Sequence, residues 1–331
     1  MRISRFARSL LFLLLPLFVV TLSTAAPIAQ AKVGKIKEFQ LPFSKKWGSN
    51  RPYIIVTGPD GNLWFTDFYT DKIGRMTPTG QYKAFNIPTK KSEPYGIAVG
   101  SDDNLWFTEQ VGSKIGRITL QGKITEYPTP TANSGPLNIT PGPDGNLWFT
   151  ENYTNKIGRI TTSGSITEFT VPTPNSGPFS IRTGPDGNLW FTESSANKIG
   201  RITLSGSITE FAVPTPGSLL RFITTGPDGN LWFTEYFANK VGRMTPTGTF
   251  TEFPIPTTNS GPFDITAGPD GNLWFLESMG DNVARITTSG SITEFPVPTP
   301  KSVPFGITNG PGGNLWFAED RGNKIAYITP Q

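Results

Sequence analysis

Residues 62–65 read Asn-Leu-Trp-Phe, and the same four residues begin again at Asn104, Asn146, Asn188, Asn230, Asn272 and Asn314. Every interval is 42 residues, and nothing is inserted between the units. A fixed period of this length is typical of repeat architectures, in which each unit buries its hydrophobic surface against its neighbours. The sequence therefore predicts seven equivalent units in one domain.

Each unit contains four short segments with strand character. In the sixth unit they are residues 262–266, 272–277, 282–287 and 291–295, and we call them strands a, b, c and d. Gly268-Pro269-Asp270-Gly271 provides turn chemistry between strands a and b, and a Ser-Gly pair does so between c and d. Four strands form one blade. The predicted fold class is all-β: a seven-bladed β-propeller of four-stranded blades.

The two ends of the chain predict how the ring closes. The last unit stops after its strand c, at Ile328-Thr329-Pro330-Gln331, and so lacks a strand d. Residues 34–39, Gly-Lys-Ile-Lys-Glu-Phe, match the pattern of residues 122–127, Gly-Lys-Ile-Thr-Glu-Tyr, which lead into and form a strand d. We therefore expect the N-terminal strand to complete the last blade, which would remove two exposed sheet edges.

The N-terminal region resembles a secretory signal. Arg2, Arg5 and Arg8 precede an apolar stretch over residues 10–20, and Ala29-Gln30-Ala31 fits a cleavage site. We expect residues 1–31 to be removed, residues 32–331 to form the single propeller domain, and the protein to be secreted or otherwise extracytoplasmic. No later stretch is long and apolar enough to insert into a membrane.

Charge and composition exclude several function classes. The 29 Lys and Arg against 25 Asp and Glu give +4, and loss of the three arginines before residue 32 leaves +1. This charge is too small for an electrostatic nucleic-acid binder. The sequence has no cysteine and no histidine, so thiolate chemistry and histidine general bases are excluded. A closed ring also predicts a monomer, because it has no free edge strand.

One rim of the ring carries the sequence variation. The d-to-a connections and b-to-c hairpins lie on it, whereas near-identical turns form the opposite rim. The starts of strand a place a collar there: Tyr53, Tyr95, Leu137, Phe179, Arg221, Phe263 and Phe305. The ends of strand b add an acidic ring: Asp67, Glu109, Glu151, Glu193, Glu235, Glu277 and Glu319. Apolar walls with a few polar groups are typical of a ligand pocket.

A structural role is the alternative for each repeated residue. The seven tryptophans of strand b are expected in the core. The acidic ring is expected to pair with the repeated basic residues of strand c, such as Lys114, Lys156, Arg117 and Arg159, or with backbone amides. Departures from the repeat are better guides to function. A longer first loop with Lys45, Lys46 and Trp47 could form a lid, and Arg221, the one cation of the collar, could hold a ligand carboxylate.

The 42-residue period, the GPDGNLWFTE string and the aromatic starts of strand a make residues 34–331 resemble the streptogramin lyases, the virginiamycin B lyase family. This resemblance implies a seven-bladed propeller that opens the ester of a cyclic depsipeptide by elimination, with Mg²⁺ and a histidine base on the variable rim. The family's rim tyrosine falls on Tyr53 and its last-blade carboxylate on Glu319. Its catalytic histidine, its second rim histidine and a further acidic residue fall on Phe305, Phe263 and Val303, so these three are lost.

Three functions follow from these observations. The first is a binding module for a small molecule, a peptide or a cell-wall fragment, held by Tyr53, Tyr95, Phe179, Arg221, Phe263, Phe305 and Trp47. The second is a divergent Mg²⁺-dependent carbon–oxygen lyase, with Glu319 and Tyr53 as catalytic residues and Glu319, beside Asp320, as the metal ligand. The third is a structural or protein-interaction scaffold. We expect the first, because the replacements for the histidines are apolar.

Overall fold

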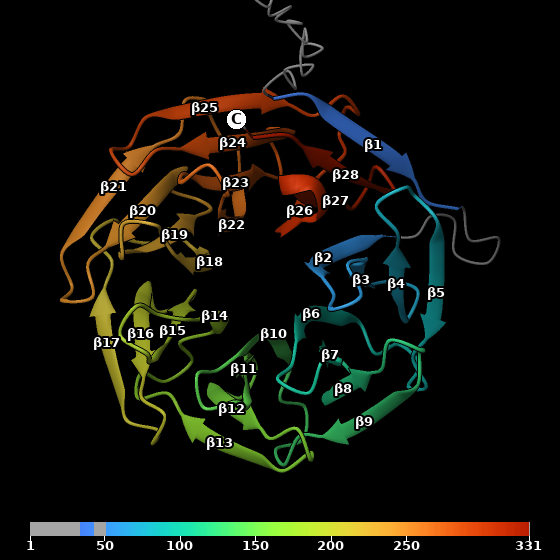
Figure 1. Cartoon of the computed structure of the whole chain (residues 1–331). Helices are drawn as coiled ribbons and strands as arrows, with labels where there is room; N and C mark the ends of the chain where they lie inside the picture. The colour runs from blue at the N-terminus through green and yellow to red at the C-terminus, as the bar shows by residue number, and fades with distance from the viewer. Residues whose placement is uncertain (1–33, 43–50, 331) are drawn as a thin grey trace, which may run out of the picture. The chain divides into compact units, whose positions relative to one another are not determined.

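The computed structural model describes residues 34–42 and 51–330 of the chain. These residues form seven antiparallel four-stranded sheets arranged in a ring, with one sheet for each repeat (Figure 1). The predicted all-β, seven-bladed propeller is therefore confirmed. Both the expected signal over residues 1–31 and the expected lid around Trp47 lie outside the described residues. Within the described part of the chain, no helix has the length and apolarity that crossing a bilayer requires.

The strands keep the order predicted for one unit, from the channel outward. Strand a is β2 (Pro52–Thr57), β6 (Pro94–Val99), β10 (Pro136–Pro141), β14 (Pro178–Thr183), β18 (Leu220–Thr225), β22 (Pro262–Ala267) and β26 (Pro304–Gly310). Strand b is β3 (Leu63–Asp67), β7 (Leu105–Glu109), β11 (Leu147–Glu151), β15 (Leu189–Glu193), β19 (Leu231–Glu235), β23 (Leu273–Glu277) and β27 (Asn314–Glu319). Strand c is β4 (Lys72–Met76), β8 (Lys114–Ile118), β12 (Lys156–Ile160), β16 (Lys198–Ile202), β20 (Lys240–Met244), β24 (Asn282–Ile286) and β28 (Lys324–Ile328). Strand d is β5 (Tyr82–Asn86), β9 (Ile124–Pro128), β13 (Ile166–Thr170), β17 (Ile208–Ala212), β21 (Phe250–Pro254) and β25 (Ile292–Pro296) in the first six blades. A short 3₁₀ turn, η1 (Pro311–Gly313), replaces the usual a-to-b turn in the seventh.

The N-terminal strand closes the ring as predicted. β1 (Ile36–Gln40) pairs antiparallel with β28, with Ile36 opposite Ile328 and Gln40 opposite Lys324. The seventh sheet therefore has the order β1-β28-β27-β26, and Figure 1 shows β1 as the outer strand of that blade. The Lys324 ammonium also forms an ion pair with the Glu38 carboxylate at 2.6 Å. Backbone pairing and charge together join the two ends of the propeller.

The repeated tryptophans lie in the core, as expected. Each is at most 1% exposed, and in the first six blades its indole N–H donates to the aspartate of the a-to-b turn, for example Trp64 to Asp60 at 3.0 Å. The strand c arginine lies over the same indole, as Arg75 does at 5.4 Å from the ring centroid. The strand d aromatic stacks on it, as Phe85 does at 5.5 Å. One repeat position thus links the turn to three strands of its blade.

Neighbouring blades are joined near the channel by a strand b threonine. The hydroxyl of Thr150 donates to the carbonyl of Phe179 at 2.9 Å, and Thr66, Thr108, Thr192 and Thr234 make the same contact with the next blade. Leu276 and Ala318 replace this threonine in the last two blades. The blades that carry Phe305 and Tyr53 are therefore joined to their preceding neighbours without this hydrogen bond.

Candidate functional site

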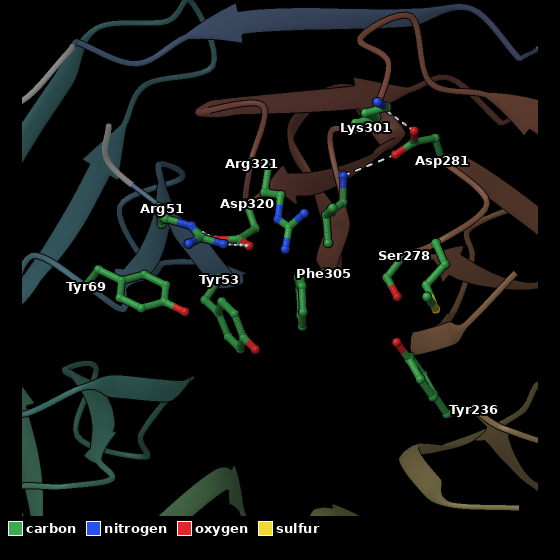
Figure 2. A pocket seen from close by; sticks show the side chains of 12 residues that line it. Arg51, Tyr53, Tyr69, Tyr236, Ser278, Asp281, Lys301, Phe305, Asp320 and Arg321 are labelled. Atoms are coloured by element: carbon green, nitrogen blue, oxygen red, sulfur yellow. Dashed lines mark hydrogen bonds and ion pairs between the residues drawn. The ribbon is translucent and has the colours of Figure 1, made fainter. Parts of the chain in front are cut away.

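The variable rim contains a cavity of about 450 Å³ over the first, fifth, sixth and seventh blades (Figure 2). Its lining residues come from strand a starts, b-to-c hairpins and d-to-a connections: Arg51, Tyr53, Tyr69, Tyr236, Ser278, Met279, Asp281, Lys301, Val303, Phe305, Asp320 and Arg321. These three segment types were the ones predicted to meet on one rim. The propeller thus brings residues from both ends of the chain to a common opening.

A second cavity of about 440 Å³ adjoins the first. Tyr53, Tyr236 and Phe305 line both cavities, and Tyr95, Phe179, Arg221 and Phe263 line only the second. Six of the seven residues predicted to bind a ligand therefore line this rim. The seventh, Trp47, falls outside the described residues.

The aromatic collar forms the floor of these cavities rather than an open ring. Tyr53 stacks on Phe305 with centroids 4.2 Å apart, and Phe263 meets Phe305 edge-on at 4.3 Å. Phe179 also reaches Phe263, two blades away, at 6.1 Å. Phe222, one residue past the collar position, is fully buried and packs on both Phe179 and Phe263. The collar therefore plugs the channel and presents aromatic faces to the rim.

Tyr53 contributes a phenol to the cavity wall (Figure 2). Burial raises the pKa of Tyr53 above its ordinary value, and the charge of Asp320 adds to this shift. At neutral pH the group is a neutral hydroxyl, which can donate one hydrogen bond and accept others. The proposed catalytic tyrosine is thus placed as a donor and not as a base.

Asp320, rather than Glu319, is the carboxylate in the cavity wall. The Asp320 side chain accepts two hydrogen bonds from Arg51, at 2.7 Å from Nε and 2.5 Å from Nη2. The guanidinium of Arg51 lies over the ring of Tyr69 at 4.4 Å, and its side-chain hydrogen bond to Asp320 raises the pKa of Arg51. The prediction that Glu319 faces a ligand needs correction. Glu319 has no exposed surface and does not line either cavity.

The rest of the acidic ring is buried in the same way, and its predicted pairing with the basic residues of strand c is wrong. The strand c lysines pair instead with the strand d glutamates, as Lys114 does with Glu126 at 3.0 Å and Lys156 with Glu168 at 2.7 Å. Arg117 and Arg159 lie instead 3.7 and 4.0 Å from Asp102 and Asp144 of the a-to-b turns. Of the ring, Asp67 alone accepts a backbone hydrogen bond, from Arg51 at 3.0 Å.

In Glu109, Glu193, Glu235 and Glu319, neither carboxylate oxygen has a hydrogen-bond partner among the described residues. Burial raises the pKa of Glu109, Glu277 and Glu319 to about 8, and the pKa of Glu151, Glu193 and Glu235 to about 7. The six glutamates are therefore predominantly or partly protonated at neutral pH, because a charged carboxylate would lose its hydration there.

The rim residues do not fit a magnesium ion. Magnesium prefers an octahedral shell of oxygen ligands. Among residues 34–42 and 51–330, no group of three acidic side chains is placed to share a metal. Glu319 is enclosed, and both oxygens of Asp320 are bound to Arg51. We derive no reaction step through this ion.

Arg221 lies on aromatic rings instead of beside a carboxylate. Its guanidinium carbon is 4.7 Å from the centroid of Phe179, 5.3 Å from Tyr236 and 5.9 Å from Phe263. Its Nε is buried without a hydrogen-bond partner, and the described residues give it no ion pair. The predicted role in holding a ligand carboxylate is compatible with this position. The cation–π contacts fix the side chain in the second cavity wall.

The main feature that our sequence reasoning missed is a set of exposed apolar side chains at the hairpin tips. Five large hydrophobic residues are more than half exposed in the described part of the chain: Tyr69 at 52%, Val111 at 52%, Tyr153 at 59%, Phe237 at 70% and Met279 at 67%. All five occupy one repeat position, in the b-to-c hairpin. Ser195 and Arg321 stand there in the other two blades. We call these five residues the apolar crown. The signal was available, since a large apolar residue stands at this position in five of the seven units.

A family model and several solved structures point to the same family. The family model described as the virginiamycin B lyase family matches residues 18–173 and 129–331. A crystal structure of selenomethionine-substituted virginiamycin B lyase from Staphylococcus aureus is 41% identical, with a TM-score of 0.85, over 90% of this chain and 99% of that chain. A streptogramin B lyase structure is 39% identical, with a TM-score of 0.85, over 90% and 98% of the two chains.

A third similar structure is a catalytically inactive histidine-to-alanine variant of the S. aureus enzyme with quinupristin. It is 41% identical, with a TM-score of 0.84, over 90% of this chain and 99% of that chain. No curated protein matches the chain significantly. The family match covers more than half of the sequence, and the structural similarity covers nearly all of the propeller. The chain therefore belongs to the virginiamycin B lyase family.

Proposed function

We propose that this protein is a binding propeller that holds an apolar, ring-bearing peptide or macrocycle on its variable rim without opening it. The apolar crown is the observation that carries the proposal. Two of its five members, Tyr69 and Met279, line the first rim cavity, and the other three directly follow hairpin residues, Gln110, Asn152 and Tyr236, that line the second. Exposed apolar groups gathered on one face are typical of interaction surfaces.

The cavities suit a ligand with flat hydrophobic groups. Tyr53 and Phe305 offer stacked ring faces at the boundary between the two cavities, and Tyr236 lies across from them (Figure 2). Aromatic rings favour offset stacking or edge contacts with other rings. The combined extent of the two cavities and the crown exceeds what a ligand of a few atoms would contact. A cyclic peptide with aromatic side chains fits this surface better than a small polar metabolite.

Several observations argue against elimination. The chain contains no histidine, and Phe305 and Phe263 stand where the family resemblance places its rim histidines. A phenyl ring cannot accept a proton. Both carboxylates of the first cavity wall are already engaged: Asp320 with Arg51, and Asp281 with the backbone N–H groups of Lys301 and Val303 at 2.5 and 3.1 Å.

The inactive relative supports the separation of binding from catalysis. Its structure pairs a catalytically inactive histidine variant with quinupristin. In that protein, loss of a histidine is thus compatible with the presence of the antibiotic in the crystal. A chain with phenylalanine in place of the histidine can likewise keep the surface that binds the ligand and lack the catalytic base.

Quinupristin is therefore the first probe to test. The purified protein is titrated with quinupristin by calorimetry, and the mixture is then incubated with Mg²⁺ and analysed by chromatography with mass detection. Elimination within a ring leaves the mass unchanged, whereas hydrolysis adds one water, so retention and mass are needed together. We expect binding with unchanged retention. A ring-opened product would establish the lyase function instead, and the absence of binding would favour a scaffold.

The crown provides a matched variant. Phe237→Ser introduces the residue that the fourth blade carries at the equivalent position, Ser195, so the fold is expected to tolerate it. Because Phe237 is 70% exposed, its loss should weaken binding by about threefold to tenfold, as the removal of one apolar contact does. The control is Thr167→Ser, an exposed strand d position away from the rim cavities. Equal effects of the two variants would contradict a role for the crown.

A further inference from the structure

A third cavity, of about 260 Å³, lies among the ends of strand a, where the a-to-b turns form the other rim of the propeller. Its lining comes from the strand a ends of six blades, and Arg182 is its one charged residue among the described residues. We propose that this cavity is a second binding site, for a small monocarboxylate with a short apolar body, and that Arg182 holds the carboxylate. The site is separate from the rim cavities and does not depend on their function.

Arg182 breaks the repeat at a position where the fold requires no charge. It is the fifth residue of β14, and the equivalent residues of the other blades are Val56, Ala98, Thr140, Thr224, Thr266 and Thr308. Four blades therefore use threonine at this depth of the channel. A single arginine in place of a small side chain is a costly substitution, because its guanidinium loses hydration. Burial accordingly lowers the pKa of Arg182.

Two contacts orient the guanidinium and leave most of its donors free. Nη1 donates to Oδ1 of Asn138 at 2.8 Å and to the carbonyl of Ile181 at 3.1 Å. Asn138 is itself 1% exposed, and its Oδ1 also accepts the backbone N–H of Ile181 at 3.1 Å. No partner among the described residues binds Nε or Nη2, and neither atom is fully enclosed. Because Arg182 lines the cavity, these donors are available to a ligand there.

The acidic residue whose charge acts on Arg182 is Asp264. Asp264, 2% exposed, accepts the backbone N–H of Ile265 at 2.9 Å on Oδ1 and that of Ile307 at 3.0 Å on Oδ2. The described residues give it no ion pair, although its charge acts on Arg182. The carboxylate of Asp264 is thus committed to the backbone of β22 and β26. Arg182 keeps the free fork of N–H groups that binds a carboxylate through two parallel hydrogen bonds.

The remaining walls define the rest of the ligand. Ile54, Val56, Ile97 and Val99 supply an apolar surface, and Thr266 adds a hydroxyl. The aromatic plug around Phe222, described above, lies between this cavity and the variable rim. A short hydrocarbon body fits these walls, whereas a strongly hydrated anion such as phosphate would leave much of its hydration shell unreplaced. Butyrate is therefore the appropriate probe.

The experiment compares butyrate, its uncharged amide butyramide and inorganic phosphate by ligand-observed NMR on the purified protein. We expect saturable binding of butyrate, at least tenfold weaker binding of butyramide, and no competition by phosphate at equal concentration. The margin for butyramide reflects the loss of a charge-assisted hydrogen bond. The proposal would be overturned if butyramide bound as tightly as butyrate, if phosphate displaced butyrate, or if butyrate did not bind.

Arg182→Thr is the decisive variant, because it installs the residue that four other blades carry there. It should lower butyrate affinity at least tenfold while the thermal midpoint stays close to that of the parent. Should this variant unfold, Arg182→Lys tests the same point. The lysine ammonium keeps the charge but lacks the two parallel N–H donors of the guanidinium, so the affinity for butyrate should be intermediate. Arg221→Ala, in the rim cavity, should leave butyrate binding unchanged. Unaltered butyrate affinity in Arg182→Thr, or loss of binding in Arg221→Ala, would refute the site.

Discussion

Arg51 and Asp320 form a bidentate ion pair between the first and last blades. The Nε–Oδ1 distance is 2.7 Å and the Nη2–Oδ2 distance is 2.5 Å. The two residues are 269 positions apart in the sequence. Their contact therefore exists only when the ring is closed. It ties the wall of the first rim cavity to the junction where the propeller begins and ends.

We expect Asp320→Asn to destabilise the protein. The amide keeps the shape of the carboxylate but removes the charge that faces Arg51, so the loss should be about 1–3 kcal/mol in the free energy of unfolding. Urea unfolding at pH 7 measures it. Glu93→Gln, a charge change in a connection of the second blade, is the control. An unchanged urea midpoint would show that the ion pair adds nothing to closure.

Deletion of residues 32–41 should leave an aggregated or unfolded product. The deletion removes β1, and with it the backbone pairing to β28 and the ion pair from Glu38 to Lys324. Two sheet edges would then be free to pair with other chains. Size-exclusion chromatography and a thermal melt report this outcome. A monomer that melts at the parent temperature would contradict the closure function of β1.

The buried glutamates predict that stability falls as the pH rises from about 4.5 to about 8. Burial raises the pKa of Glu319 to about 8 and of Glu193 to about 7, whereas the unfolded chain releases these protons near 4.5. In that window the native state binds more protons than the unfolded state, so its free energy of unfolding declines with pH. Urea midpoints at pH 5, 7 and 9 measure the decline.

The strand d glutamates set the limit on the acidic side. Burial alone would raise the pKa of Glu168, but hydrogen bonds from Lys156 and Thr131 outweigh it and lower this pKa. The pKa is lowered in the same way in Glu38, Glu126, Glu210 and Glu252. Their contribution is lost as the pH falls below about 4.5. Glu193→Gln should make the fall of the urea midpoint between about pH 4.5 and 8 less steep. It should leave the loss of stability below about pH 4.5 unchanged. A urea midpoint that rises with pH up to pH 8 would show that the buried glutamates do not have raised pKa values in the native state.

The inter-blade threonines predict a cost for removing a single oxygen. Thr150→Val keeps the side-chain shape but loses the hydrogen bond to the Phe179 carbonyl and the one accepted from the Asn138 backbone N–H. Because both partners are buried, we expect a loss of about 1–3 kcal/mol. Thr167→Val, at an exposed strand d position, is the control and should change little. Equal denaturation midpoints for both variants would show that the hydrogen bond between Thr150 and Phe179 does not contribute to stability.

The repeat predicted the fold closely because each unit carries its own turn chemistry and strand pattern. The strand bounds expected for the sixth blade agree with β22, β23, β24 and β25 to within one residue at each end. Closure was predictable as well, since the missing strand d of the last unit matches residues 34–39. These features depend on local sequence that is present in several copies.

The site was predicted less well, because it depends on contacts between blades. The prediction chose Glu319, which ends β27 with its side chain buried, whereas Asp320, the first residue of the hairpin that follows, lines the cavity. Its partner Arg51 lies at the far end of the chain. Arg182 is one of three departures from threonine at its repeat position, and its cavity forms only once the strand a ends of six blades come together.

The pairing of β1 with β28 also fixes a sequence of events during folding. Glu38 is synthesised early, yet its partner Lys324 follows 286 residues later. Until that partner is made, β1 cannot form its pairing with β28. Such distant pairing slows folding and lengthens the time for which an unpaired edge is vulnerable to other chains. The arrangement that makes the finished ring stable thus makes its assembly depend on β28, the last of the described strands.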